Sequence, residues 1–205
     1  MAVVVGLGIF GAAMLWLDVP VGRWAAAQGK WPKAMEQVAR LPGHFVFTLA
    51  IGAALVLWRR RWWPAIALLS AGAGSGMVVW LMKWLAGRQR PKVGLDRAFV
   101  FEPMGGGWAG LIWQKPNLSF PSGDVALAVA TAVCLGHGLG RWAWAFYVWA
   151  IVVAAQRVSS ASHYVSEVVL AAVLGVVLAK TAIGLAGVLG RRGEASELGT
   201  ESAEP

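Results

Sequence analysis

The chain has 205 residues, of which 58% are hydrophobic and only 14% are charged, and its formal net charge is +8. Soluble domains carry about 25% charged residues, so this composition excludes an ordinary soluble protein and indicates a membrane protein. The basic charge does not indicate nucleic-acid binding, because the basic residues flank apolar stretches. The single cysteine, Cys134, excludes an internal disulfide.

Apolar stretches dominate the chain, and we compare each with the roughly 20 residues that a helix needs to cross a bilayer. About six spans are predicted, at Ala2–Leu17, Phe45–Trp58, Pro64–Leu85, Ser122–Leu139, Trp142–Gln156 and Glu167–Leu189. The first lacks a basic leader and a cleavage site, so we expect a membrane helix and not a removable signal peptide. Backbone groups inside a bilayer must be satisfied internally, so the expected fold is an all-α integral membrane bundle.

The remaining segments are more polar. Residues Asp18–His44 mix basic and apolar side chains and are expected to lie along the membrane interface. Residues Ala86–Phe120 are rich in glycine and proline and form the one long loop. Residues 194–205 carry glutamates without an apolar face and are predicted to form a disordered acidic tail.

Two short segments have the composition of an anion site. Lys83 and Arg90 are seven residues apart, two helical turns if the helix persists, so both cations can point toward one anion. Ser122 and Gly123 follow a proline at the expected start of a span, where free N–H groups and the helix dipole accept phosphate oxygens. Taken alone, the first segment also fits a lipid-facing pair and the second an ordinary helix cap.

A third segment contains Arg157, His163 and Glu167. Arg157 offers a planar fork of donors to a phosphate. His163 and Glu167 are four residues apart and share a helical face if the helix starts early. The carboxylate can then hold one imidazole nitrogen and leave the other free as a nucleophile. Span parity places all three segments on one face of the membrane.

The full pattern is Lys, six residues, Arg-Pro; then Pro-Ser-Gly; then Arg, five residues, His, three residues and an acid. It resembles the type 2 phosphatidic acid phosphatase family of membrane lipid phosphatases, which shares its site with glucose-6-phosphatase and vanadium haloperoxidases. The phosphoryl-binding residues that the resemblance implies are Lys83, Arg90, Ser122, Gly123 and Arg157. The resemblance also implies that His163, oriented by Glu167, attacks phosphorus to form a phosphohistidine, and that no metal or other cofactor is needed.

Two positions depart from the family pattern. The orienting acid is usually aspartate, and Glu167 is one methylene longer but should still reach His163. The residue after Pro-Ser-Gly is usually a histidine that protonates the leaving oxygen, and here it is Asp124. An aspartate with the ordinary pKa of about 3.9 is almost fully ionised at neutral pH, so it is a poor proton donor.

Several interpretations of Asp124 stay open. It can act as a general acid if burial outweighs the nearby cations, or it can orient a water or another donor such as His44. His137 is excluded, because it lies about 20 Å away along its span. Alternatively, the leaving group needs no proton, as in a lipid diphosphate or at a sugar-1-phosphate centre, and we therefore hypothesise a bias toward lipid diphosphates or activated phosphates.

Two other classes of function compete with an enzyme. Without its acid, the site can bind phospholipids as a regulatory membrane protein, but the retained His163–Glu167 pair favours catalysis. A channel or transporter can use the basic loop as an anion funnel, but no inverted halves are visible in the sequence.

We therefore expect one membrane phosphatase domain over residues 1–193, with residues 86–120 as its catalytic loop, acting on a lipid-linked phosphate at the membrane surface. The expected partners are that substrate and membrane lipids. The basic clusters Arg59–Arg61 and Arg191–Arg192 predict cytoplasmic termini and an extracytoplasmic site, in a bacterial inner membrane. The opposite side carries more basic residues, but an anion site requires such charges wherever it lies.

Overall fold

The computed structural model describes residues 2–28, 31–59, 63–104, 107–112 and 117–201, and its regular elements are helices. They are α1 (Ala2–Trp16), α2 (Asp18–Ala27), α3 (Lys33–Arg40), α4 (Phe45–Arg59), α5 (Trp63–Ala86), α6 (Ala109–Ile112), α7 (Gly123–Leu139), α8 (Trp144–Ser159) and α9 (Val165–Glu201). Short 3-10 turns lie at η1 (Leu41–Gly43), η2 (Pro91–Val93), η3 (Leu95–Arg97) and η4 (Gly140–Ala143). The predicted all-α fold class is confirmed.

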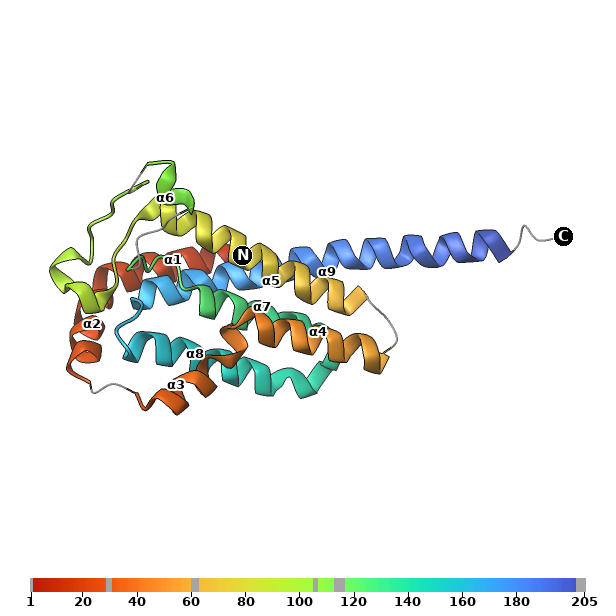
Figure 1. Ribbon diagram of the computed structural model, residues 1–205, viewed down its shortest axis with the longest axis horizontal. Coiled ribbons are helices and arrows are strands. Elements are labelled where there is room, and N and C mark those ends of the chain that lie inside the picture. The colour runs from red at the N-terminus through yellow and green to blue at the C-terminus, as the bar shows by residue number, and fades with distance from the viewer. Residues whose placement is uncertain (1, 29–30, 60–62, 105–106, 113–116, 202–205) are drawn as a thin grey trace.

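The long helices run side by side along the long axis of the molecule (Figure 1). α7 packs against α5, α8 and α9 and is the central helix of the bundle, while α1 packs on α9 and α4 packs on α5. The C-terminal part of α9 extends beyond the other helices at one end (Figure 1). At the opposite end lie α2, α3 and the segment that follows α5 (Figure 1).

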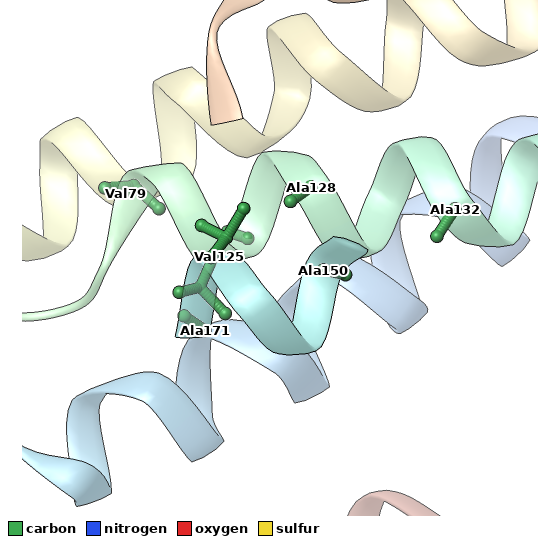
Figure 2. Packing of buried hydrophobic residues seen from close by; sticks show 8 residues of the cluster. Val79, Val125, Ala128, Ala132, Ala150 and Ala171 are labelled. Atoms are coloured by element: carbon green, nitrogen blue, oxygen red, sulfur yellow. The ribbon is translucent and has the colours of Figure 1, made fainter. Parts of the chain in front are cut away.

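The main core cluster joins α5, α7, α8 and α9 and consists mostly of alanine and valine (Figure 2). Small side chains let helices approach closely, as at Gly175 of α9, where a Cβ atom would lie 2.5 Å from the Ala126 carbonyl oxygen of α7. Within this cluster, Val79 and Val153 lie one helical turn before Lys83 and Arg157. The core therefore fixes the helix ends that carry the predicted site.

Within the predicted interfacial segment, residues 18–28 and 31–44 form two short helices and a turn. α2 is bent by 62° from α1, and the unit of α3 and η1 is bent by 55° from α4. Both bends direct the segment across the end of the bundle at which the long loop also lies (Figure 1). A position along the membrane interface stays a prediction for this segment.

By length and composition, α5 and residues Val165–Gly190 of α9 can each cross a membrane, and the two bent pairs raise the number of candidate spans to four. α7 is a shorter apolar helix over Gly123–His137. The predicted number of about six spans therefore stays a prediction. The backbone of α9 is helical through Glu201, inside the stretch predicted to be a tail, and residues 202–205 lie outside the described part of the chain. Lys30, Arg60, Arg61 and Lys115 of the predicted basic groups also lie outside it.

Candidate active site

Four helix ends meet at one end of the bundle. α5 and α8 end there, with Lys83 and Arg157 in their last turns, and α7 and α9 begin there, with Asp124 and Glu167 in their first turns. The charges of Arg157, Asp124 and Glu167 all act on the Lys83 ammonium group. The structure thus brings the three predicted segments together.

The segment from Lys83 to Arg90 does not continue as a helix. α5 ends at Ala86, and Gly87 takes a positive φ of 61° at a point where a Cβ atom would lie 1.9 Å from the Glu102 carbonyl oxygen. Arg90 instead lies in extended backbone, and its N–H donates to the Asn117 carbonyl at 3.1 Å. A turn and not a shared helical face therefore places Arg90 beside Lys83. The charge of Arg90 acts on the Lys83 ammonium group.

The extended backbone after Gly87 also ties the first segment to the second. Gln89 and Leu118 form an isolated antiparallel bridge, and the N–H of Ser119 donates to the Arg88 carbonyl at 2.8 Å. Ser122 then occupies the N-cap position of α7 and lies fully buried, and its Oγ has no hydrogen-bond partner among the described residues. An unpartnered buried hydroxyl beside the free N–H groups of a helix start is suited to an anion.

His163 and Glu167 are in direct contact. His163 Nδ1 lies 3.0 Å from Glu167 Oε2, so the extra methylene of glutamate does reach the imidazole. α9 begins only at Val165, and Glu167 also accepts from the Tyr164 N–H at 3.3 Å, as the acid of a capping box does. The contact is made across the helix cap, whereas the sequence suggested a shared helical face. His163 is held beside Arg157 because its N–H donates to the Arg157 carbonyl.

Sequence reasoning did not identify the residues behind Glu167. Ser119 Oγ donates to Glu167 Oε1 at 2.7 Å, and Arg88 NH1 lies 3.3 Å from the same oxygen. Arg88 NH2 donates to Asp18 Oδ2 at 2.8 Å, and Asp18 in turn accepts from the backbone and side chain of Ser166. The side chains of Arg88, Asp18 and Glu167 have no exposed surface. An acid at the end of an apolar run, such as Asp18, is a signal in the sequence that a partner cation is needed.

Asp124 does not stand alone in the site. Its Oδ2 accepts from Arg40 Nε at 2.8 Å and lies 3.5 Å from Arg157 Nε. Glu36 completes this group of charges, with Oε1 3.6 Å from Arg40 NH1 and 3.9 Å from Arg157 NH1. Arg40 and Glu36 were missed as site residues, although a Glu–Arg pair four residues apart on an amphipathic helix is a recognisable feature.

Neither of the two other histidines is hydrogen-bonded to a site residue that the structure describes. The imidazole of His44 is exposed and makes no hydrogen bond or ion pair with the described residues, although the neighbouring Gly43 packs against Asp124. His137 lines a cavity with Trp63, at the start of α5 and therefore far from Lys83. No hydrogen bond or ion pair therefore supports the interpretation of His44 as a substitute donor. His137 lies near the C-terminal end of α7, away from Asp124, as the sequence predicts.

The electrostatic surroundings keep His163 neutral. Burial, followed by the charges of Arg157, Lys83 and Arg90, holds the pKa of His163 well below its usual 6.5. In the tautomer whose Nδ1–H donates to the Glu167 carboxylate, the lone pair of the imidazole lies on Nε2. A neutral imidazole facing three cations is suited to attack an anion that the cations bind. Among the described residues, no group of three or more His, Cys, Asp and Glu side chains is placed to hold a metal ion.

A family model described as the PAP2 superfamily matches residues 64–188, which is more than half of the chain. This range includes every predicted site residue from Lys83 to Glu167 but excludes Asp18, Glu36 and Arg40. The chain matches no curated protein and no solved structure. Its apolar helices and this match together show that the chain belongs to the PAP2 superfamily and is a membrane phosphatase of that superfamily.

Proposed function

We propose that the protein is an integral membrane lipid phosphatase that works through a phosphohistidine at His163 and favours lipid diphosphates over lipid monophosphates. The observation that carries the proposal is the 3.0 Å contact between His163 Nδ1 and the buried carboxylate of Glu167, beside the cations that lower the pKa of His163. This arrangement keeps Nε2 unprotonated, which a residue that only binds phosphate does not require.

In the proposed reaction, Lys83, Arg90 and Arg157 hold the terminal phosphoryl group, with the Ser122 hydroxyl and the start of α7 as further donors. His163 Nε2 forms a bond to phosphorus, and the bond from phosphorus to the leaving oxygen breaks. Water then attacks the phosphohistidine, the N–P bond breaks, and its electron pair returns to Nε2. Both protons of the water leave with the product as dihydrogen phosphate. The chain's own residues supply every group in these steps, so we propose that no metal is needed.

An apolar groove beside the start of α7 supports a lipid substrate. The groove has a volume of about 490 Å³ and is lined by Gly43, Phe45, Gly72, Ala73, Gly76, Met77, Gly123 and Leu127. The space beside Gly76 is open, because a Cβ atom there would meet nothing within 4 Å. A hydrocarbon chain in this groove would reach the backbone of Gly123, which is proposed to hold the phosphate.

The ion pair of Asp124 supports the diphosphate preference. Asp124 Oδ2 lies 2.8 Å from the Arg40 guanidinium and 3.5 Å from the Arg157 guanidinium, so this carboxylate is engaged with two cations and is not placed as a donor to a leaving oxygen. An alkoxide leaving group requires a proton, whereas a phosphate leaving group departs as a stable anion. We further propose that the site faces the extracytoplasmic side of a bacterial inner membrane and that both termini are cytoplasmic.

The test is phosphate release by the full-length protein in detergent with EDTA, from a polyprenyl diphosphate and from phosphatidic acid. The wild-type protein is expected to release phosphate from both and faster from the diphosphate. His163→Ala should abolish release without unfolding the protein, while the matched variant His137→Ala, at the far end of α7, should keep it.

Each part of the proposal has its own contrary result. Release that persists in His163→Ala contradicts the nucleophile, and release that stops with EDTA contradicts metal independence. A clear preference for phosphatidic acid contradicts the diphosphate bias. Binding of these lipids by folded wild-type protein without any release would identify a regulatory phospholipid-binding protein instead.

A further inference from the structure

The guanidinium group of Arg40 contacts the residue that stands where the family pattern leads us to expect a proton donor. Asp124 occupies the usual histidine position, and its Oδ2 accepts from Arg40 Nε at 2.8 Å. Arg40 belongs to α3, outside the range matched by the family model, so the family pattern does not predict this contact. The pair places a fixed positive charge at the open side of the site.

Both ends of the segment that carries Arg40 are anchored to the bundle. After Arg40, Gly43 packs so tightly on α7 that a Cβ atom there would lie 2.7 Å from the Cβ of Asp124. Before α3, Trp31 Nε1 donates to Ser159 Oγ at the end of α8, at 3.0 Å. The position of Arg40 is therefore set by contacts with the two helices that also carry Asp124 and Arg157.

Arg40 keeps donors for a ligand. An arginine has five N–H donors, and among the residues that the structure describes the Arg40 guanidinium makes one contact of hydrogen-bond length, through Nε to Asp124. Its NH1 lies 3.6 Å from Glu36, which is an ion pair without a hydrogen bond. The Arg40 side chain is 30% exposed and that of Asp124 is 21% exposed, so a ligand can reach the pair.

We propose that Arg40, oriented by Asp124, binds the leaving phosphate of a lipid diphosphate and so replaces the proton donor with a fixed charge. The inference rests on the proposed function and adds the residue that selects the substrate class. Lys83, Arg90 and Arg157 hold the phosphoryl group that is transferred, and Arg40 holds the phosphate that stays on the lipid. Arginine suits this role because its planar fork matches phosphate oxygens and its proton is never lost.

The chemistry balances without a proton donor. Nε2 of neutral His163 bonds to the terminal phosphorus, the bridging P–O bond breaks, and its electron pair stays on the bridging oxygen. A trianionic diphosphate thereby gives a lipid monophosphate dianion and a phosphohistidine of net charge −1 on the transferred group and ring together. Arg40 transfers no proton in this step, and its charge stabilises the oxygen on which negative charge develops.

The test compares two substrates in one set of variants. Arg40→Gln should lower kcat/KM for a polyprenyl diphosphate by about 10- to 100-fold, the range for a lost hydrogen bond to a charged group. Release from the matching polyprenyl monophosphate should change less than about threefold, because its leaving alkoxide carries no phosphate oxygens for Arg40 to bind. Arg40→Lys should lie between wild type and Arg40→Gln, and Arg23→Gln, an exposed arginine of α2, should match wild type.

Inhibition provides a readout that does not depend on turnover of the lipid. Inorganic pyrophosphate should inhibit Arg40→Gln more weakly than wild type by about the same 10- to 100-fold, while orthophosphate inhibits both alike. Asp124→His, which restores the family residue and removes the carboxylate that orients Arg40, should shift the substrate ratio toward the monophosphate.

Equal losses on both substrates in Arg40→Gln and Arg40→Lys would overturn the proposal, because they would show a structural or general phosphate-binding role. Unchanged diphosphate release would overturn it equally. These results differ from a failure of the proposed function, in which wild-type protein releases no phosphate or His163→Ala stays active. If Arg40→Gln does not fold, the substrate ratio and the pyrophosphate inhibition of Arg40→Lys decide the question.

Discussion

The two sides of His163 are built differently. Behind the imidazole, Glu167, Arg88 and Asp18 form a chain of charges with no exposed side-chain surface, and each charge is paired. In front of it, the side chains of Asp124, Arg40 and Glu36 are 21%, 30% and 34% exposed. The ion pairs behind His163 are therefore fixed by folding. The charged side chains in front of it are accessible, so a bound ligand can replace the ion-pair partners that they have in the free protein.

This difference has an energetic consequence. Removing one partner of a buried ion pair costs about 3–5 kcal/mol, because the other charge is left without compensation. An exposed pair contributes only about 0–1 kcal/mol, since water and salt replace the lost partner. Changes behind His163 should therefore act on folding and on the nucleophile, and changes in front should act on substrate choice.

The largest effect is expected from Arg88→Met. The substitution leaves the carboxylates of Asp18 and Glu167 buried without their cation, and it removes the guanidinium that packs 3.9 Å from the Tyr164 ring centre. We expect the free energy of unfolding in detergent to fall by about 3–5 kcal/mol. The matched control is Arg97→Met, because Arg97 pairs with Glu102 at 2.6 Å but is 41% exposed. An equal loss of unfolding free energy in Arg88→Met and Arg97→Met would show that buried and exposed ion pairs contribute alike to stability, and would contradict the difference between the two sides of His163.

Glu167→Gln tests the buried side through catalysis. Arg88 and Ser119 would hold the amide oxygen, so the amide NH2 would face His163 and favour the tautomer whose proton lies on Nε2. That tautomer has no lone pair for phosphorus, and we expect kcat to fall by about 100-fold or more with KM little changed. Ser166→Ala is the control, since Ser166 contacts Asp18 and Arg88 but not Glu167. Unchanged kcat in Glu167→Gln contradicts an orienting role.

The two sides also differ in how far the sequence predicts them. The spacing of Lys83, Arg157, His163 and Glu167 predicts their meeting, because helix periodicity and span parity determine which helix ends share a side of the bundle. Asp18 and Arg40 could not be placed from the sequence. Asp18 is far from its partners along the chain, and the contact of Arg40 depends on the bend before α4 and on the close approach at Gly43. Such long-range packing has no local signal.

The turn at Gly87 shows the same limit on a smaller scale. Two cations seven residues apart can share a helical face, and the sequence allows this reading for Lys83 and Arg90. The helix ends first, since Gly87 adopts a left-handed conformation against the Glu102 carbonyl. Both cations still reach the site, which shows that a motif can constrain where side chains meet more strongly than it constrains the backbone between them.

The pH dependence of stability tests the burial of His163. Its pKa is held well below 6.5 in the folded protein, first by burial and then by nearby cations, whereas an unfolded histidine has the ordinary value. As the pH falls below about 6.5, only the unfolded state gains this proton, so the free energy of unfolding falls. Between pH 8 and pH 5 the wild type should lose about 2 kcal/mol more than His163→Gln, at up to about 1.4 kcal/mol per pH unit. If the free energy of unfolding of the wild type and of His163→Gln fell in parallel with pH, His163 would take up its proton in the folded state over the same pH range as in the unfolded state, which contradicts its lowered pKa.

Glu36→Gln should give the smallest effect and the clearest view of the open side. Glu36 lies 3.6 Å from Arg40 and 3.9 Å from Arg157, so its negative charge competes with a phosphate for both guanidinium groups. Its removal should lower KM for a lipid diphosphate by about two- to fivefold at low ionic strength, with kcat and the free energy of unfolding nearly unchanged. The effect should fade in 1 M salt, because a half-exposed charge is screened. If Glu36→Gln lost as much unfolding free energy as Arg88→Met, the charged groups in front of His163 would also be needed for folding. They would then not be available to change their contacts when a ligand binds.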